Sequence, residues 1–131
     1  MRFGAAEAAD PEALRALVGE GAAVAFEIAG SSEAVQLAMA ATWAGGRVVL
    51  GGIPDDDTTT FRAAMARRKG LTIAMVRRMN EVYPRAIALA ASTKVDLTSL
   101  VTDRYPLEEA ATAFGNAARR TGLKVVVEPA S

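Results

Sequence analysis

The chain has 131 residues, of which 15 are Lys or Arg and 15 are Asp or Glu, so its formal net charge is zero. This balance argues against nucleic-acid binding, for which a strongly basic face is typical. The sequence contains no Cys and no His. Disulfides, an ordinary zinc site and catalysis by cysteine or histidine are therefore excluded within these residues.

The apolar composition indicates a protein with a hydrophobic core and without a membrane-spanning segment. Hydrophobic residues make up 51% of the chain and aromatic residues only 5%, which is typical of Ala-rich helices packed closely on a sheet. We expect a single domain covering residues 1–131. No apolar run reaches the roughly 18 residues that cross a bilayer. The first residues do not resemble a secretory signal, so we expect a cytoplasmic location.

The first elements in chain order are a helix and an apolar strand. Asp10-Pro11-Glu12 predicts a helix start, because Asp can cap the helix, Pro suits its first turn and Glu suits the positive end of its dipole. Gly19 and Gly21 predict the end of that helix. The run from Ala22 to Gly30 is apolar apart from Glu27, as in strands that are covered on both faces. A buried carboxylate needs a partner, so Glu27 is interpreted as structural.

A second helix and a second strand follow. The helix is predicted to begin at Ser31 or Ser32 and to end at the glycines 45 and 46. Its inward-facing stripe is predicted to be Val35, Ala38, Met39 and Thr42. The segment 47–52, RVVLGG, is the next strand. Helices and strands that alternate with short joints are typical of an α/β protein with a parallel sheet.

The middle of the chain begins with a polar loop at residues 55–60. Residues 61–70 predict a short helix, and we expect the three basic residues 67–69 within it to be solvated. The segment from Leu71 to Val76 is rich in apolar and β-branched residues and predicts another strand.

The last part of the chain alternates again. A helix is predicted to begin near Pro84, and a loop with a short extended piece around Val101 follows it. Pro106 predicts the start of another helix, and Gly122 predicts its end. Residues 123–129, LKVVVEP, form a last apolar strand.

Five segments occur in the order and at nearly the spacing of one known family: FEIAG, GGRVVLGGIP, RRMNEVYPRAI, DLTSLVTDRYPLEEAATAF and LKVVVEP. From about Gly4 to Pro129 the chain resembles the C-terminal half of a medium-chain, zinc-type alcohol dehydrogenase, in particular the sorbitol and threonine dehydrogenase branch. The resemblance implies an α/β fold, a partial Rossmann-like doubly wound parallel sheet with flanking helices. It would contain the family's strands four, five and six and an extra dimerisation strand, Leu71 to Val76.

Two parts of that family have no counterpart in this sequence. The fingerprint G-x-G-x-x-G and the second strand, whose acidic end holds the ribose, are not matched. The catalytic domain with its Cys and His zinc ligands is not matched either. We therefore expect no catalytic residue and no metal ligand in this chain, and weak or absent binding of NAD or NADP.

The resemblance nevertheless implies part of a cofactor site at the ends of the strands. Residues 28–30 and 51–53 would line the nicotinamide and its ribose, residues 76–78 would reach the nicotinamide side, and Lys124 would lie near the phosphates. The matching positions are Ile28, Ala29, Gly30, Gly51, Gly52, Ile53, Val76, Arg77, Arg78 and Lys124. Glycines at the end of an apolar strand indicate a close approach to the backbone. A tight turn at Gly51-Gly52, and ordinary surface charge at the basic positions, remain alternatives.

Three functions are compatible with this sequence. The chain can be an inactive part of an NAD(P)-dependent zinc-type alcohol or polyol dehydrogenase. It can be the subunit of a split dehydrogenase, whose partner chain supplies the missing half. It can also be a non-catalytic module that associates with itself. We expect a homodimer, formed through the edge strand from Leu71 to Val76 or through the unpaired edge of residues 23–28.

Overall fold

The computed structural model describes residues 5–77, 79 and 81–129. Backbone contacts divide the chain into two compact units, Met1–Arg78 and Met79–Ser131. Each unit has a parallel sheet of its own with flanking helices, which confirms the predicted α/β class. The single domain predicted for residues 1–131 stays a prediction.

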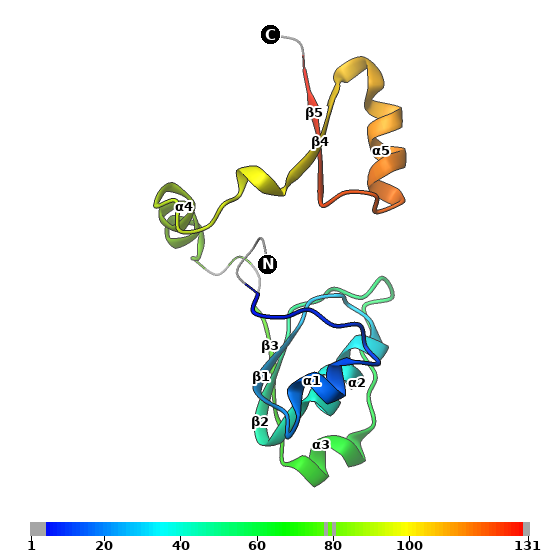
Figure 1. Cartoon of the computed structure of the whole chain (residues 1–131), viewed down its shortest axis with the longest axis vertical. Coiled ribbons are helices and arrows are strands. Elements are labelled where there is room, and N and C mark those ends of the chain that lie inside the picture. Colours follow the sequence, from blue (N-terminus) through cyan, green and yellow to red (C-terminus); the bar gives the residue numbers. More distant parts are fainter. Residues whose placement is uncertain (1–4, 78, 80, 130–131) are drawn as a thin grey trace. The chain divides into compact units, whose positions relative to one another are not determined.

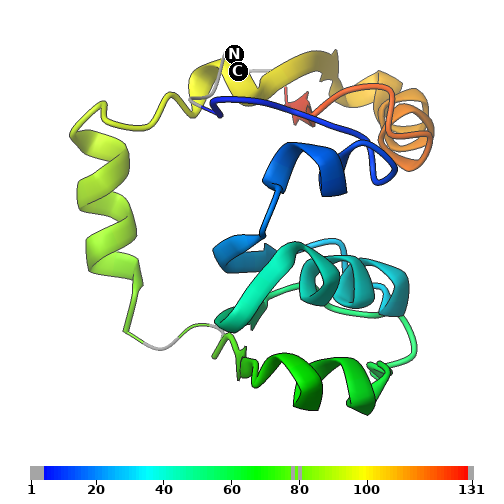
Figure 2. The ribbon, with the colours of Figure 1, turned by 60° about the horizontal axis from the view of Figure 1, so that its bottom comes forward.

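The first unit is a three-stranded parallel sheet with its helices on one side. Its elements are α1 (Leu14–Val18), β1 (Ala22–Glu27), α2 (Ser32–Ala41), β2 (Thr42–Leu50), α3 (Ala63–Lys69) and β3 (Thr72–Met75). The strands lie in the order β1-β2-β3, and both neighbouring pairs are parallel. All three helices lie on the same side of this sheet (Figure 1). Helices α2 and α3 are neighbours there, as Figure 2 shows.

The core of the first unit lies between α2 and β2. Val35 and Met39 of α2 pack against Val48 and Leu50 of β2, and Met39 and Val48 are completely buried. Ala38 belongs to the same cluster. The inward-facing stripe predicted from the helical spacing is therefore confirmed for Val35, Ala38 and Met39, whereas Thr42 is buried but begins β2.

The second helix ends earlier than the sequence predicts. It stops at Ala41, and β2 begins at Thr42, whereas the glycines 45 and 46 predict a later end. Thr42 is completely buried, and its hydroxyl donates a hydrogen bond of 2.7 Å to the Ala38 carbonyl. Gly45 and Gly46 instead belong to an irregularity in the pairing of β1 with β2.

Lys69 provides the physical reason for this early end. Its Nζ donates hydrogen bonds to the carbonyls of Met39 at 3.1 Å, Ala40 at 2.7 Å and Thr42 at 2.5 Å. A helix C-terminus leaves such carbonyls without partners inside the helix, and a positive charge there interacts favourably with the helix dipole. The expectation that residues 67–69 are solvated is therefore wrong for Lys69.

The strand predicted at Leu71 to Val76 is β3, but it is not an addition to the sheet. It pairs with β2 in parallel, with Val48 opposite Ile73 and Leu50 opposite Met75. It is thus the third regular strand of the sheet and one of its two edges.

The second unit contains α4 (Tyr83–Ala91), η1 (Thr98–Leu100), β4 (Val101–Pro106), η2 (Leu107–Glu109), α5 (Ala110–Ala118) and β5 (Lys124–Glu128). Strands β4 and β5 pair in parallel, and α5 packs beside them (Figure 1). The helix predicted near Pro84 is confirmed as α4. The short extended piece predicted around Val101 is a strand of six residues. The helix predicted from Pro106 begins as one 3-10 turn and continues as α5.

Candidate functional site

Most of the predicted site residues lie at the carboxyl ends of the strands of the first sheet. Residues 28–30 follow β1, residues 51–53 follow β2, and residues 76 and 77 follow β3. The carboxyl ends of the three strands meet at this edge, because all of them are parallel. Ligands of open parallel α/β sheets bind outside such an edge. A role of these residues in binding a cofactor stays a prediction.

Two predicted residues are not part of this arrangement. Arg78 lies outside the described residues. Lys124 begins β5 in the second unit and pairs with Val101, so it belongs to a different sheet from the other predicted residues. Its role near the cofactor phosphates stays a prediction.

The turns after β1 and β2 are in close contact with each other. The Glu27 carbonyl accepts hydrogen bonds from the Gly51 amide at 2.8 Å and the Gly52 amide at 3.0 Å. A Cβ added to Gly52 would collide with the Gly30 backbone, at 2.5 Å from Gly30 Cα. A Cβ on Gly30, which has a φ of 75°, would lie 2.5 Å from the Ile53 carbonyl oxygen. Gly30 and Gly52 are therefore needed because the two turns of this chain lie against each other at these positions.

Gly51 is different, because it lies beside exposed side chains. A Cβ at Gly51 would be 3.0 Å from Ile28 Cδ1 and 3.5 Å from Val76 Cγ2. Ile28 is 69% exposed, Ile53 is 66% exposed and Val76 is 53% exposed. Gly51 is half-buried and has no side chain of its own, so its backbone lies directly beside the exposed Ile28 and Val76 side chains. An apolar surface with a few backbone polar groups is a suitable floor for a flat, weakly polar ring.

The sequence predicts the burial of Glu27 but not the identity of its partner. Its side chain is 4% exposed, and its Oε1 accepts a hydrogen bond of 2.6 Å from the Gly30 amide. The structural carboxylate with a partner that the sequence predicts is therefore confirmed. The sequence did not predict that this partner belongs to the candidate site, because that contact depends on the shape of the turn.

An apolar groove lies along the outer edge of β1. It has a volume of about 360 Å³ and is lined from α1, β1 and α2. Its residues are Leu14, Val18, Ala22, Ala25, Phe26, Glu27, Ile28, Ala29, Ala34, Leu37, Ala38 and Ala41. Strand β1 has β2 on one side, and its other side is the edge of the sheet in the described part of the chain. Phe26 is 69% exposed there.

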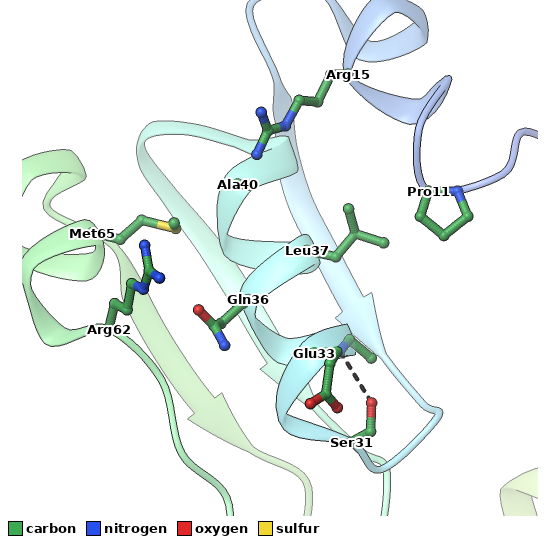
Figure 3. Close-up of a pocket in the computed structure, with 10 residues that line it drawn as sticks. Pro11, Arg15, Ser31, Glu33, Gln36, Leu37, Ala40, Arg62 and Met65 are labelled. Atoms are coloured by element: carbon green, nitrogen blue, oxygen red, sulfur yellow. Dashed lines mark hydrogen bonds between the residues drawn. The ribbon is translucent and has the colours of Figure 1, made fainter.

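A larger hollow, of about 600 Å³, lies away from this edge (Figure 3). Its floor is the outward face of α2, and Arg15 and Arg62 lie on opposite sides of it. None of the predicted site residues lines it. Ser31 lies at its end and caps α2, since its Oγ accepts a hydrogen bond of 3.1 Å from the Ala34 amide. The alternative cap, Ser32, instead accepts a hydrogen bond from the Thr60 amide.

Other kinds of site find little support in the described residues. Within residues 5–77, 79 and 81–129, no three Asp, Glu, His or Cys side chains gather in a way that could hold a metal ion. The ligands that a zinc site prefers are also missing from the whole sequence, which has no Cys and no His. No helix in this part of the chain has the length and the apolar character to cross a membrane.

Comparison with known proteins gives similarities over most of the chain. A sequence model described as zinc-binding dehydrogenase matches residues 1–92. A Rhizobium meliloti protein named as a D-xylulose reductase is 39% identical over 112 residues, which are 84% of this chain and 32% of that protein. Sorbitol dehydrogenase of Ovis aries is 35% identical over 112 residues, which are 86% of this chain and 31% of that protein. The chain thus spans about a third of the length of these relatives.

The solved structures agree with these similarities. A structure from Sinorhizobium meliloti, described as a zinc-binding dehydrogenase bound to NADP, matches with a TM-score of 0.79 and 27% identity. The match covers 95% of this chain and 40% of that one. Alcohol dehydrogenase of Thermus sp. ATN1 matches with a TM-score of 0.76 and 25% identity, over 94% of this chain and 36% of that one.

Proposed function

We propose, because this chain belongs to the zinc-binding dehydrogenase family, that it supplies the nicotinamide side of the cofactor site in an NAD(P)-dependent polyol or alcohol dehydrogenase. The observation that carries the proposal is the gathering of residues 28–30, 51–53 and 76–77 at the carboxyl ends of the strands, with Gly51, which has no side chain, among them. The relatives named as sorbitol dehydrogenase and D-xylulose reductase support a polyol or the related ketose as substrate.

In this proposal the chain binds and orients the cofactor, and it does not carry out the reaction itself. The cofactor supplies hydride transfer when it is bound. Ile28, Ile53 and Val76 offer apolar surface to one face of the ring, and Gly51 allows the ring to approach the backbone between them. Packing on one face restricts how the ring can rotate, which is a contribution to orientation.

The same proposal holds that the chain alone has no dehydrogenase activity. The residues of this sequence do not fit a zinc ion, since thiolate and imidazole ligands are missing from it. The chain also has no match to the glycine-rich turn that holds the pyrophosphate, so cofactor affinity is expected to be low.

Saturation-transfer NMR with NADH tests this proposal. Protons of the nicotinamide ring are expected to receive saturation from the chain, and protons of the adenine ring much less. Gly51→Val should abolish the nicotinamide signal, because it fills the space between Ile28 and Val76. Gly115→Ala is the matched control, since a Cβ at Gly115 meets only Arg119 Nη1, at 3.6 Å. Equal signals from the two rings, or an unchanged signal in Gly51→Val, would contradict the proposal.

A second candidate function is that of a subunit in a split dehydrogenase. The groove beside the free edge of β1 favours it, because this edge and its apolar lining suit an added strand from a partner chain. The partner can be tested as the N-terminal two thirds of a sorbitol dehydrogenase relative. NAD-dependent sorbitol oxidation should appear on mixing and should be lost with Phe26→Asp. Mixing that restores no activity would count against this candidate. A cytoplasmic location remains a prediction under either function.

A further inference from the structure

We infer that Glu27 is a positioning residue, which holds together the turns after β1 and β2 and thereby fixes the surface offered to the nicotinamide ring. The part of this inference that concerns the cofactor rests on the proposed function. The hydrogen bonds of Glu27 within the chain are independent of that proposal.

Glu27 accepts three amide hydrogens from the two turns. Its Oε1 accepts from Gly30 in the turn after β1, at 2.6 Å. Its own carbonyl accepts from Gly51 at 2.8 Å and from Gly52 at 3.0 Å, in the turn after β2. The side chain thus fixes one turn and the backbone fixes the other. A bond from an amide to a carboxylate is stronger than one between neutral groups.

The two turns are closely packed around Glu27. A Cβ added at Gly52 would be 2.7 Å from Glu27 Oε2 and 2.5 Å from Gly30 Cα. The two turns therefore touch through backbone atoms, and the carboxylate fills the space at their junction. Ile28 and Ile53 are direct chain neighbours of these contacts, so a displaced junction moves both exposed side chains.

Within the described part of the chain, the Glu27 carboxylate has the Gly30 amide as its partner and no cation at ion-pair distance. Among the described residues the one ion pair within 4.0 Å joins Arg104 and Glu128, in the second unit. A carboxylate with 4% exposure is costly to bury unless it is hydrogen-bonded. The Gly30 amide is therefore held by a carboxylate, which binds it more strongly than a neutral acceptor would.

Two substitutions distinguish the role of Glu27 as a hydrogen-bond acceptor from a role in packing alone. Glu27→Gln keeps a side-chain oxygen that can accept from Gly30, and Glu27→Met keeps the volume but removes the acceptor. We expect the Gly30, Gly51 and Gly52 amide resonances of the cofactor-free chain to move in Glu27→Met and to be largely restored in Glu27→Gln. The nicotinamide saturation signal should be lost in the first variant and retained in the second. Glu33→Met, at an exposed position on α2, is the matched control.

The outcomes distinguish this inference from the proposed function. Unmoved amide resonances in Glu27→Met overturn the inference, whatever NADH does. Moved resonances with an unchanged nicotinamide signal overturn the positioning role and leave the cofactor site standing. A wild-type chain without any nicotinamide signal contradicts the proposed function, and with it the role of Glu27 toward the cofactor. If Glu27→Met does not fold, Glu27→Leu replaces it, because it also removes the acceptor, and the same amide resonances are measured.

Discussion

The ammonium group of Lys69 is expected to be a major single contribution to the stability of the first unit. Lys69→Met removes the charge and the three bonds to Met39, Ala40 and Thr42, but keeps most of the apolar stem. Hydrogen bonds to a charged group contribute about 1.5–3 kcal/mol. A favourable charge at a helix C-terminus adds about 0.3–1 kcal/mol. Because the three bonds share one partly buried ammonium, we expect a total loss of about 2 kcal/mol.

Urea unfolding followed by the fluorescence of Trp43 measures this loss. Trp43 is the only Trp of the chain and follows Thr42 directly, so its signal reports the first unit. With a urea dependence of about 2 kcal/mol per molar, the midpoint should fall by about 1 M. Arg68→Met is the matched control on the same helix, because Arg68 is exposed, and it should change stability by less than about 0.5 kcal/mol. A midpoint for Lys69→Met within error of the wild type, or an equal loss in the control, would refute this reasoning.

Three other predictions follow from the fold and the sequence. Met39→Ala should lower the stability of the first unit by about 2–5 kcal/mol, since Met39 is completely buried against β2, and the same urea assay measures it. The chain should form a dimer through the edge strand β3, and Met75→Lys, at a residue that is 71% exposed, should make it monomeric in light scattering at micromolar concentration. A wild-type monomer under those conditions contradicts the dimer itself. The purified chain supplied with zinc, NAD and sorbitol should produce no NADH, and turnover by contaminant-free protein would overturn that expectation.

The elements that the sequence predicted well are those with a local pattern. The stripe of Val35, Ala38 and Met39 follows the helical period, and it packs on the sheet as expected. The strand β4 was underestimated because its inward positions, such as Val101 and Tyr105, alternate with charged and polar ones. Residues with that composition indicate a loop when the partner strand is not known.

The end of α2 depends on a contact that no local pattern contains. Lys69 lies 27 residues beyond Thr42 in the sequence, and it binds the last carbonyls of the helix. The glycines 45 and 46 are stronger local stop signals, and they predict an end that is too late.

The candidate site could be predicted in its outline and not in its contacts. Parallel strands place their carboxyl ends together, so the gathering of residues 28–30, 51–53 and 76–77 follows from the predicted sheet. The contact of Gly30 with Gly52, and the bond of Glu27 to Gly30, depend on the conformations of both turns. The position of Lys124 in a second sheet depends on its pairing with β4. None of these long-range relations is encoded in residue spacing.

The first sheet also carries a face that no helix of its own unit covers (Figure 1). Val24 and Phe26 lie on alternate positions of β1, and they are 44% and 69% exposed. Exposed apolar patches promote self-association in solution. These two side chains therefore favour self-association of the isolated chain as its concentration rises. Polar residues at these two positions would be the first choice for a variant intended for spectroscopy, because neither side chain belongs to the buried cluster.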